Sequence, residues 1–283
     1  MKNYKTSLVL EGGGLRGAYT TGALAWLIDN NVEFDNVYGI STGAVHLCNY
    51  LLKDKKNLFD FSTKYVIDPR AIGVRAFLRC GRIVDYDLLF EELLLNTAKF
   101  DFSPLKNVKE NGYIGLYVLE DGKTEYISAR EIVLKQLQAA TTLPIIGKPS
   151  VVNGKHLFDG GITEMIPIRQ AQEDGCQKHL IITTKPEGYV RKPSNPIVVK
   201  IMRLLYHKWP HMAADYRIRH QNYYKQIEEV EKLENEDKAL YIFPSKTSNV
   251  SRLGGSQAEL EELYKLGYED MENQKEKILE LFK

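Results

Sequence analysis

The chain has 283 residues, of which 43% are hydrophobic and 27% are charged, and this composition predicts a folded protein with a sizeable core rather than a disordered chain. Lys and Arg number 38 against 37 Asp and Glu, and this formal net charge of +1 excludes the global basic character expected of a nucleic-acid-binding protein. No apolar stretch approaches the roughly 18 residues of a membrane span, and the apolar run before Gly12 is too short for a signal peptide.

The three cysteines, Cys48, Cys80 and Cys176, are widely separated and form no C-x-x-C pair. Such spacing supplies neither a disulfide framework nor a familiar zinc site. We therefore expect a reduced, cytoplasmic protein that touches membranes only peripherally.

The hydrophobic pattern of the first two thirds of the chain alternates between short apolar runs and helical periodicity. This alternation predicts an α/β protein with a mainly parallel sheet. The expected strands are 7–11, 36–40, 113–119, 124–127, 156–158 and 178–184, and the expected helices are 17–30, 43–53, 85–96 and 130–140.

A proline-rich connector at 191–196 divides the chain, because proline restricts its own backbone and that of the preceding residue. We expect a catalytic α/β domain at 1–190 and a mainly helical C-terminal extension at 191–283, packed on or beside the core. Six apolar residues fall at helical spacing in that extension: Met212, Tyr216, Tyr223, Ile227, Val230 and Leu233. The last thirty residues predict two short amphipathic helices separated near Gly267.

The charges of the C-terminal third are unevenly distributed. Residues 185–225 hold nine Lys or Arg against two Asp or Glu, whereas residues 226–283 hold eight against fourteen. Within the basic part, 197–209 mixes large apolar residues with cations, which suits peripheral contact with an anionic membrane. The alternative is a helix packed on the core, with its cations in water.

The first strand runs into a glycine-rich loop that precedes a helix. Glycines there permit a tight turn with exposed N–H groups, and a helix N-terminus adds partial positive charge, so the loop can hold an anion. Its candidate residues are Gly12, Gly13, Gly14, Arg16 and Gly17. Arg16 either assists the bound anion or anchors the loop through an ion pair.

The same glycines formally match a dinucleotide-binding fingerprint, Gly12-x-Gly14-x-x-Gly17. That fingerprint requires an acidic residue at the far end of the next strand, where it would hold the ribose. Glu33 and Asp35 instead precede that strand, so this alternative is the weaker one.

The second strand ends in Gly39-Ile-Ser-Thr-Gly43, which has the form of a nucleophile elbow around Ser41. Small flanking residues permit the sharp turn that projects a serine hydroxyl from the backbone. The alternative interpretation is a glycine-bordered turn with a helix-capping serine. A nucleophile and an anion-binding loop at the ends of adjacent strands are the parts that acyl transfer needs.

A serine hydroxyl needs a base, and none of the six histidines stands in a motif typical of one. Asp159 follows a strand and precedes Gly160 and Gly161, so backbone and substrate can approach it closely. A carboxylate oriented beside a partly desolvated serine can accept its proton. The alternative is an ordinary turn aspartate.

Taken together, Gly12–Gly17, Gly39–Gly43 and Asp159–Gly161 resemble the patatin-like phospholipase family. The likeness extends from 8 to about 184 and includes Ala140–Pro144 before the aspartate. The resemblance implies a three-layer α/β/α fold and hydrolysis of lipid acyl esters by a Ser41–Asp159 dyad, with no metal or organic cofactor. One departure is Glu164–Pro167, where many members have an asparagine before the proline.

The sequence thus predicts a serine acyl hydrolase of the phospholipase A, lysophospholipase or lipid esterase type, with a lipid acyl ester as substrate and no nucleic-acid partner. One alternative is an α/β-hydrolase with a Ser-Asp-His triad, although such enzymes place more strands before the elbow. The others are a non-catalytic lipid-binding module and a dinucleotide-binding protein. The sequence predicts neither the head group nor the oligomeric state.

Overall fold

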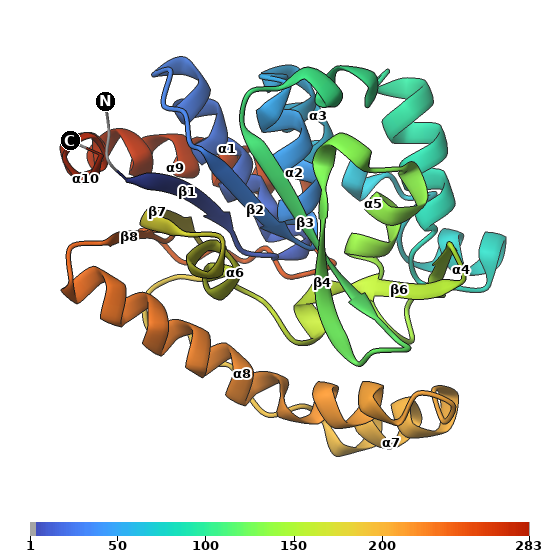
Figure 1. Cartoon of the computed structure of the whole chain (residues 1–283). Coiled ribbons are helices and arrows are strands. Elements are labelled where there is room, and N and C mark those ends of the chain that lie inside the picture. The colour runs from blue at the N-terminus through green and yellow to red at the C-terminus, as the bar shows by residue number, and fades with distance from the viewer. Residues whose placement is uncertain (1–3, 283) are drawn as a thin grey trace.

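A computed structural model describes residues 4–282 as an eight-stranded sheet with helices on both faces (Figure 1). Along the sheet the strands follow the order β5-β6-β3-β2-β1-β7-β8, and β4 pairs separately with β3. The pairs that join β3, β2, β1, β7 and β8 are parallel, whereas β4, β5 and β6 pair antiparallel. The expected mainly parallel α/β fold is confirmed.

The strands are β1 (Lys5–Leu10), β2 (Asn36–Ile40), β3 (Asn111–Val118), β4 (Lys123–Ser128), β5 (Ser150–Val152), β6 (Lys155–Asp159), β7 (Cys176–Ile182) and β8 (Ala239–Ile242). The α-helices are α1 (Gly17–Asp29), α2 (Thr42–Leu51), α3 (Lys55–Thr63), α4 (Val74–Cys80), α5 (Leu134–Thr141), α6 (Ile168–Glu173), α7 (Pro196–Leu205), α8 (Pro210–Asn235), α9 (Gln257–Asn273) and α10 (Lys275–Leu281). A π-helix, η3, spans Leu88–Thr97. Short 3-10 turns are η1 (Gly14–Arg16), η2 (Tyr65–Ile67), η4 (Ser103–Asn107), η5 (Ala129–Glu131) and η6 (Gly160–Ile162).

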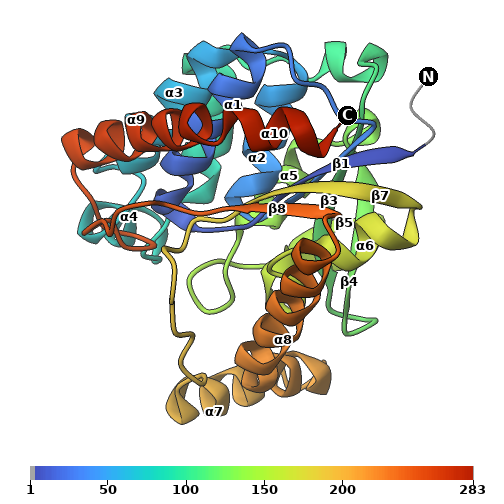
Figure 2. The same ribbon diagram turned by 90° about the vertical axis from the view of Figure 1, so that its left-hand side faces the viewer.

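Three layers are visible when the sheet is seen from its side in Figure 2: α1, α2, α3, α9 and α10 on one face, and α6 and α8 on the other. The apolar runs of β1 and β2 are buried throughout because both faces of the sheet are covered. One core cluster lies under the first group of helices and a second lies between the sheet and α8.

All strands and helices expected within 1–190 are present, with ends displaced by at most four residues. The helical spacing found from Met212 to Leu233 corresponds to α8. The expected break near Gly267 is wrong, because α9 continues through that residue. A Cβ on Gly267 would lie 2.1 Å from the Tyr19 carbonyl oxygen, so this glycine permits close packing of α9 on α1.

The C-terminal extension is part of the core architecture. Its strand β8 extends the sheet by pairing with β7, and α9 covers α1 on the opposite side of the sheet from α8. Tyr19 donates a hydrogen bond to Asp270 at 3.0 Å, and the Trp26 indole donates to Glu272 at 2.6 Å. The N-terminal helix α1 and the C-terminal helix α9 therefore pack together on one face of the sheet.

The register of β3 brings the ends of two other strands together. Ile40, the last residue of β2, pairs with Gly115, and Asp159, the last residue of β6, pairs with the next residue, Leu116. Because the two pairings are one residue apart on β3, the chain that follows β2 begins beside Asp159.

Candidate active site

Ser41 occupies a strained turn between β2 and α2. Its backbone φ is 58° and its ψ is −129°, a conformation that residues with a side chain rarely adopt. The turn is tight enough that a Cβ on Gly39 would lie 2.5 Å from the Gly43 carbonyl oxygen. The two glycines of the elbow motif therefore permit the backbone path that presents the Ser41 side chain.

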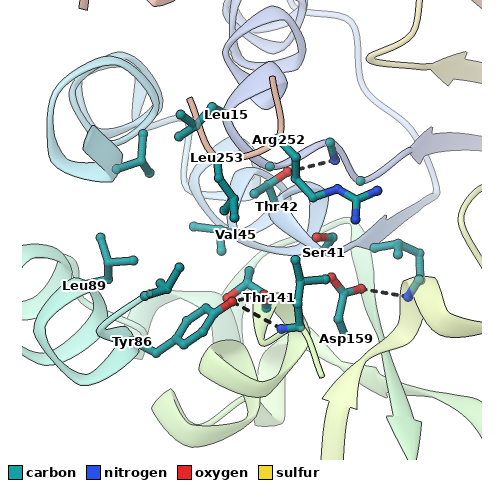
Figure 3. A pocket seen from close by; sticks show the side chains of 18 of the residues that line it. Leu15, Ser41, Thr42, Val45, Tyr86, Leu89, Thr141, Asp159, Arg252 and Leu253 are labelled. Atoms are coloured by element: carbon teal, nitrogen blue, oxygen red, sulfur yellow. Dashed lines mark hydrogen bonds between the residues drawn. The ribbon is translucent and has the colours of Figure 1, made fainter. Parts of the chain in front are cut away.

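Asp159 faces Ser41 from the end of β6 (Figure 3). Both side chains line the same pocket, and the Asp159 Oδ1 accepts the Gly161 backbone N–H at 2.7 Å. Only 2% of Asp159 is exposed, and this burial raises the pKa of its carboxyl group, while the neighbouring Ser41 hydroxyl, the Gly161 N–H and the positive charges of Arg219 and Arg252 oppose the rise. The carboxylate is thus oriented toward the serine and is poorly hydrated.

The glycine-rich loop passes directly beside the serine. A Cβ on Gly12 would lie 2.5 Å from the Ser41 Cβ, so no larger residue fits there. The Gly13 N–H donates to the Thr42 hydroxyl at 3.3 Å, and the Leu15 N–H donates to the Arg252 carbonyl at 3.0 Å. Within residues 4–282, the N–H groups of Gly12 and Gly14 make no recorded hydrogen bond and are free for an incoming oxygen.

A buried ion pair fixes the start of this loop. The Lys185 ammonium lies 2.6 Å from the Glu11 carboxylate and also donates to the Gly12 carbonyl at 2.7 Å and to the Thr184 hydroxyl at 2.8 Å. Burial lowers the pKa of Lys185, and the Glu11 charge opposes that effect. With three acceptors the ammonium is fully hydrogen-bonded, so the pair ties the end of β1 to the chain after β7.

A pocket opens over Ser41 and Asp159 and contains about 860 Å³ of non-protein space, its mouth included. One side is apolar and the other carries four cations against the single carboxylate of Asp159. The apolar wall consists of Leu15, Val45, Phe61, Val66, Ile72, Val84, Leu89, Phe90, Leu143 and Leu253. The cationic wall consists of Lys185, Arg191, Arg219 and Arg252.

The family model for patatin-like phospholipases matches residues 8–171, more than half of the chain. The chain belongs to the patatin-like phospholipase family. At the level of the family, this membership supports hydrolysis of lipid acyl esters. A second family model, a domain of unknown function called DUF6363, matches residues 209–283.

Two known proteins are similar to this chain. The uncharacterized protein YjjU of Escherichia coli is 27% identical over 278 residues, which are 93% of this chain and 75% of YjjU. The crystal structure of VipD from Legionella pneumophila superposes with a TM-score of 0.54 at 12% identity, over 96% of this chain and 66% of VipD, just under two thirds of that protein. The second similarity shows that the fold is shared.

The structure brings together most residues that the sequence singled out for a patatin-like site. Ser41, Asp159 and Gly161 line the same pocket as the loop residues Gly12, Gly13 and Gly14, whereas Gly160 packs against the Gly115 carbonyl behind them. Arg16 does not line the pocket, and within residues 4–282 it forms no ion pair. Gly17 instead makes room for His46, whose Nε2 would lie 2.6 Å from a Cβ at that position.

The histidines lie away from the Ser41–Asp159 pair, and none lines this pocket of the patatin-like fold. Burial lowers the pKa of His46 to about 3, so its ring stays neutral. His179 bonds the Ser7 hydroxyl at 2.7 Å within the sheet, and His156 bonds Glu120 at 2.6 Å.

Sequence reasoning missed the part of the site that comes from the end of the chain. Arg191, Arg219 and Arg252 are scattered over sixty residues with no motif around them, so no local signal could have marked them. Gln226 of α8 was also missed. Its buried amide accepts the N–H groups of Met165 and Ile166 at 3.0 Å and holds the chain that follows the Asp159 turn, at the departure from the family pattern.

Proposed function

We propose that this protein is a serine acyl hydrolase that cleaves lipid acyl esters through a Ser41–Asp159 dyad. The observation that carries the proposal is the position of the strained Ser41 next to the buried Asp159 in one pocket, beside a glycine loop in which the Gly12 and Gly14 N–H groups make no recorded hydrogen bond within residues 4–282. The arrangement contains a nucleophile, a base and an oxyanion site around one point.

In the proposed reaction, the Ser41 Oγ attacks the ester carbonyl and its proton passes to Asp159. The negative oxygen that forms is held by N–H groups of the glycine loop, where those of Gly12 and Gly14 are unoccupied within residues 4–282 and that of Gly13 would have to leave the Thr42 hydroxyl. Asp159 then returns the proton to the departing alcohol, which leaves an acyl group on Ser41. Water gives a proton to Asp159 and attacks this acyl group, and Ser41 recovers its hydrogen as the carboxylic acid leaves.

The apolar wall gives the acyl chain a place to lie. Seven of its ten side chains come from the stretch that runs from α2 to η3, and Leu15, Leu143 and Leu253 come from η1, the segment after α5 and the segment before α9. Each buried methylene contributes about 0.8 kcal/mol, so an acyl chain along this wall gains substantial binding energy. Small soluble esters have few methylenes and would gain little of this binding energy.

The experiment that tests the proposal combines serine labelling with a panel of esters. A fluorophosphonate probe should label the wild-type protein at one serine and leave the Ser41→Ala variant unlabelled. Hydrolysis of phospholipid, lysophospholipid, monoacylglycerol and short acyl esters should fall together in that variant, while Ser245→Ala, at an exposed serine, should behave as wild type.

Undiminished labelling or hydrolysis in Ser41→Ala would overturn the assignment of the nucleophile. Loss of turnover in His220→Ala with the fold intact would favour the Ser-Asp-His alternative, since His220 lies in an adjoining pocket. A nicotinamide or flavin absorbance in the purified protein would favour the dinucleotide-binding alternative, and a wild-type protein that is neither labelled nor hydrolyses any ester of the panel would favour a lipid-binding module.

We further propose that α7 makes peripheral contact with anionic membranes. Within residues 4–282 no helix has both the length and the apolar character needed to cross a bilayer. On α7, however, Ile197 is 68% exposed and Leu204 is 75% exposed, next to the exposed cations Lys200 and Arg203. This combination suits a helix that lies on a lipid surface.

Vesicle co-sedimentation tests the membrane contact. Wild-type protein should bind anionic vesicles at low salt and release them near 1 M salt, where the Debye length falls to about 3 Å. A Lys200→Glu/Arg203→Glu variant should bind less, and Lys238→Glu, at an exposed cation beyond the other end of α8, serves as the control. Equal binding to neutral and anionic vesicles would contradict the electrostatic contact.

A further inference from the structure

The three arginines of the cationic wall lie where two pockets meet. Arg191, Arg219 and Arg252 line the pocket over Ser41 and also line a second, outer pocket. The other residues of the outer pocket are mostly polar: Tyr189, Val190, Lys192, Ser194, Tyr216 and His220. The guanidinium groups therefore separate the reacting centre from a polar compartment next to it.

These arginines are held in place but lack anionic partners. Arg219 donates its Nε–H to the Gly161 carbonyl, and the Arg191 guanidinium lies 4.4 Å from the centre of the Tyr223 ring. Arg191 is only 9% exposed, yet its Nε has no hydrogen-bond partner within residues 4–282. None of the three forms a recorded ion pair in that part of the chain, whereas Arg70, Arg79 and Arg169 at the surface each do.

The local charge balance is unfavourable for an empty site. Lys185 is matched by Glu11, so Asp159 is the one carboxylate in the pocket lining that faces three guanidinium groups. Burial and the positive charges of Arg252 and Arg191 lower the pKa of Arg219 to about 10, and it therefore stays protonated at neutral pH. Arg191 is buried and Arg219 and Arg252 are half-buried, and cations held this close together are stabilised by a bound anion.

Figure 3 shows the Arg252 side chain extending toward Ser41 from the loop above the pocket. Its position is fixed by the glycine loop, because the Arg252 carbonyl accepts the Leu15 N–H at 3.0 Å and a Cβ on Gly14 would lie 2.7 Å from the Arg252 Cγ. An anion held by this arginine would thus lie close to the scissile ester of a substrate bound at Ser41.

We propose that Arg191, Arg219 and Arg252 form a subsite for a phosphate group of the substrate, next to Ser41 and opposite the apolar wall. This inference rests on the proposed function and adds a specificity to it: lipids with a small, exposed phosphate are preferred over zwitterionic and neutral lipids. Guanidinium groups suit phosphate oxygens because several N–H donors converge in a planar fork. Arg219 and Arg252 belong to the region matched by DUF6363, which makes head-group recognition a role for that region.

Binding of uncleavable ether lipids tests the subsite without relying on hydrolysis. Calorimetry with wild-type protein would compare 1-O-hexadecylglycerol 3-phosphate, its phosphocholine counterpart and neutral 1-O-hexadecylglycerol, each below its micelle concentration. We expect the phosphomonoester to bind at least about tenfold more tightly than the neutral ether, the size of one hydrogen bond to a charged group. Equal affinities for the phosphomonoester and the neutral ether would overturn the proposal whatever the variants do.

Variants then assign the effect to the arginines. Arg252→Gln and Arg191→Gln should each reduce phosphomonoester binding about tenfold and leave binding of the neutral ether unchanged. Arg217→Gln, an exposed arginine on the same helix as Arg219, is the matched control and should bind as wild type. Unchanged phosphomonoester binding in both pocket variants, with their melting temperatures intact, would contradict the subsite.

Inorganic phosphate distinguishes a lipid head group from a free anion. Competition at millimolar phosphate that disappears in Arg252→Gln would show that the arginines bind phosphate by itself, and no competition would show that the lipid chain is required. The two proposals can fail separately. Arginine-dependent binding of the ether phosphate without ester hydrolysis would reject the hydrolase alone, and Ser41-dependent hydrolysis with equal binding of both ethers would reject the phosphate subsite alone.

Discussion

The two walls of the pocket differ in origin as well as in chemistry. Almost all of the apolar wall comes from residues 15–143, inside the region matched by the patatin-like family model, whereas the cationic wall comes from residues 185–252, outside it. Most of the apolar side chains also belong to the main core cluster or pack against it, so they stabilise the fold whatever the protein binds. Three of the four cations form no recorded ion pair within residues 4–282.

In the proposed reaction, the two parts of the chain serve different steps. The part matched by the patatin-like family model supplies Ser41, Asp159, the glycine loop and most of the surface on which an acyl chain would lie. The C-terminal segment completes the sheet through β8 and carries Arg219 and Arg252 to the pocket. Under the proposed phosphate subsite, the chemistry would be shared across the family while the C-terminal segment would set which head group is accepted.

The largest effect on turnover is expected at Asp159, in the reacting centre that the two walls share. Asp159→Asn should lower kcat by roughly a thousandfold or more for anionic and neutral esters alike, because it removes the base from the shared centre. The amide can still accept the Gly161 N–H, so the fold should be retained. Steady-state kinetics checks this result, with circular dichroism as the control for folding. If kcat fell for anionic esters alone, the two classes of ester would not share one reacting centre.

A large effect on stability is expected at Lys185, the one cation of its wall with a buried carboxylate partner. Lys185→Met leaves the Glu11 carboxylate buried without its ion pair and should reduce the free energy of unfolding by about 3–5 kcal/mol. Adding Glu11→Gln should recover much of that loss. Urea denaturation measures the free energy of unfolding of both variants. The control is Lys178→Met, because the hydrogen bond of Lys178 to the Asp237 carbonyl is exposed. We expect its free energy of unfolding to stay within about 0.5 kcal/mol of wild type.

A smaller and more selective effect is expected on the apolar wall. Leu89→Trp fills space along the proposed path of the acyl chain and should lower kcat/KM for long-chain esters about tenfold relative to short-chain esters. Preference between phosphate-bearing and neutral head groups should not change. The matched control is Leu279→Trp on the surface of α10, and a uniform loss across chain lengths would mean that this wall does not bind the chain.

The smallest effect is a displacement of the pH profile. Burial raises the pKa of Asp159, and a base must be deprotonated, so kcat/KM should fall as the pH is lowered through a pKa above the ordinary value of about 3.9. The acidic limb should be shared by neutral and anionic esters. A limb at or below the ordinary aspartate pKa would mean that another group limits the reaction.

The same raised pKa has a consequence for folding. The folded state holds the Asp159 proton more tightly than the unfolded chain does, so this contribution to stability is present below about pH 3.9 and is lost as the pH rises through the folded-state pKa. The neutral Asp159→Asn variant should therefore gain stability relative to wild type as the pH rises toward 7. Thermal melts across that range check the sign, and a constant difference would contradict it.

Local sequence determined much of this protein. Glycine is needed at Gly39, where a Cβ would lie 2.5 Å from the Gly43 carbonyl oxygen, and apolar runs predict strands that are covered on both faces. These signals are short-range, since they reflect backbone sterics and hydrophobic period. They were sufficient to predict the mainly parallel fold and to single out Ser41 and Asp159.

Tertiary structure alone decided what surrounds those two residues. The pairing of β3 with both β2 and β6 sets Ser41 beside Asp159, and packing of α9 on α1 turns Gly267 from an expected helix break into a contact. Likewise, the charge excess of 185–225 is visible in the sequence, but only the fold divides it between the pocket and the surface of α7. The physical reason is that partners separated by 40 to 250 residues are chosen by packing and burial, which leave no periodic or local pattern in the chain.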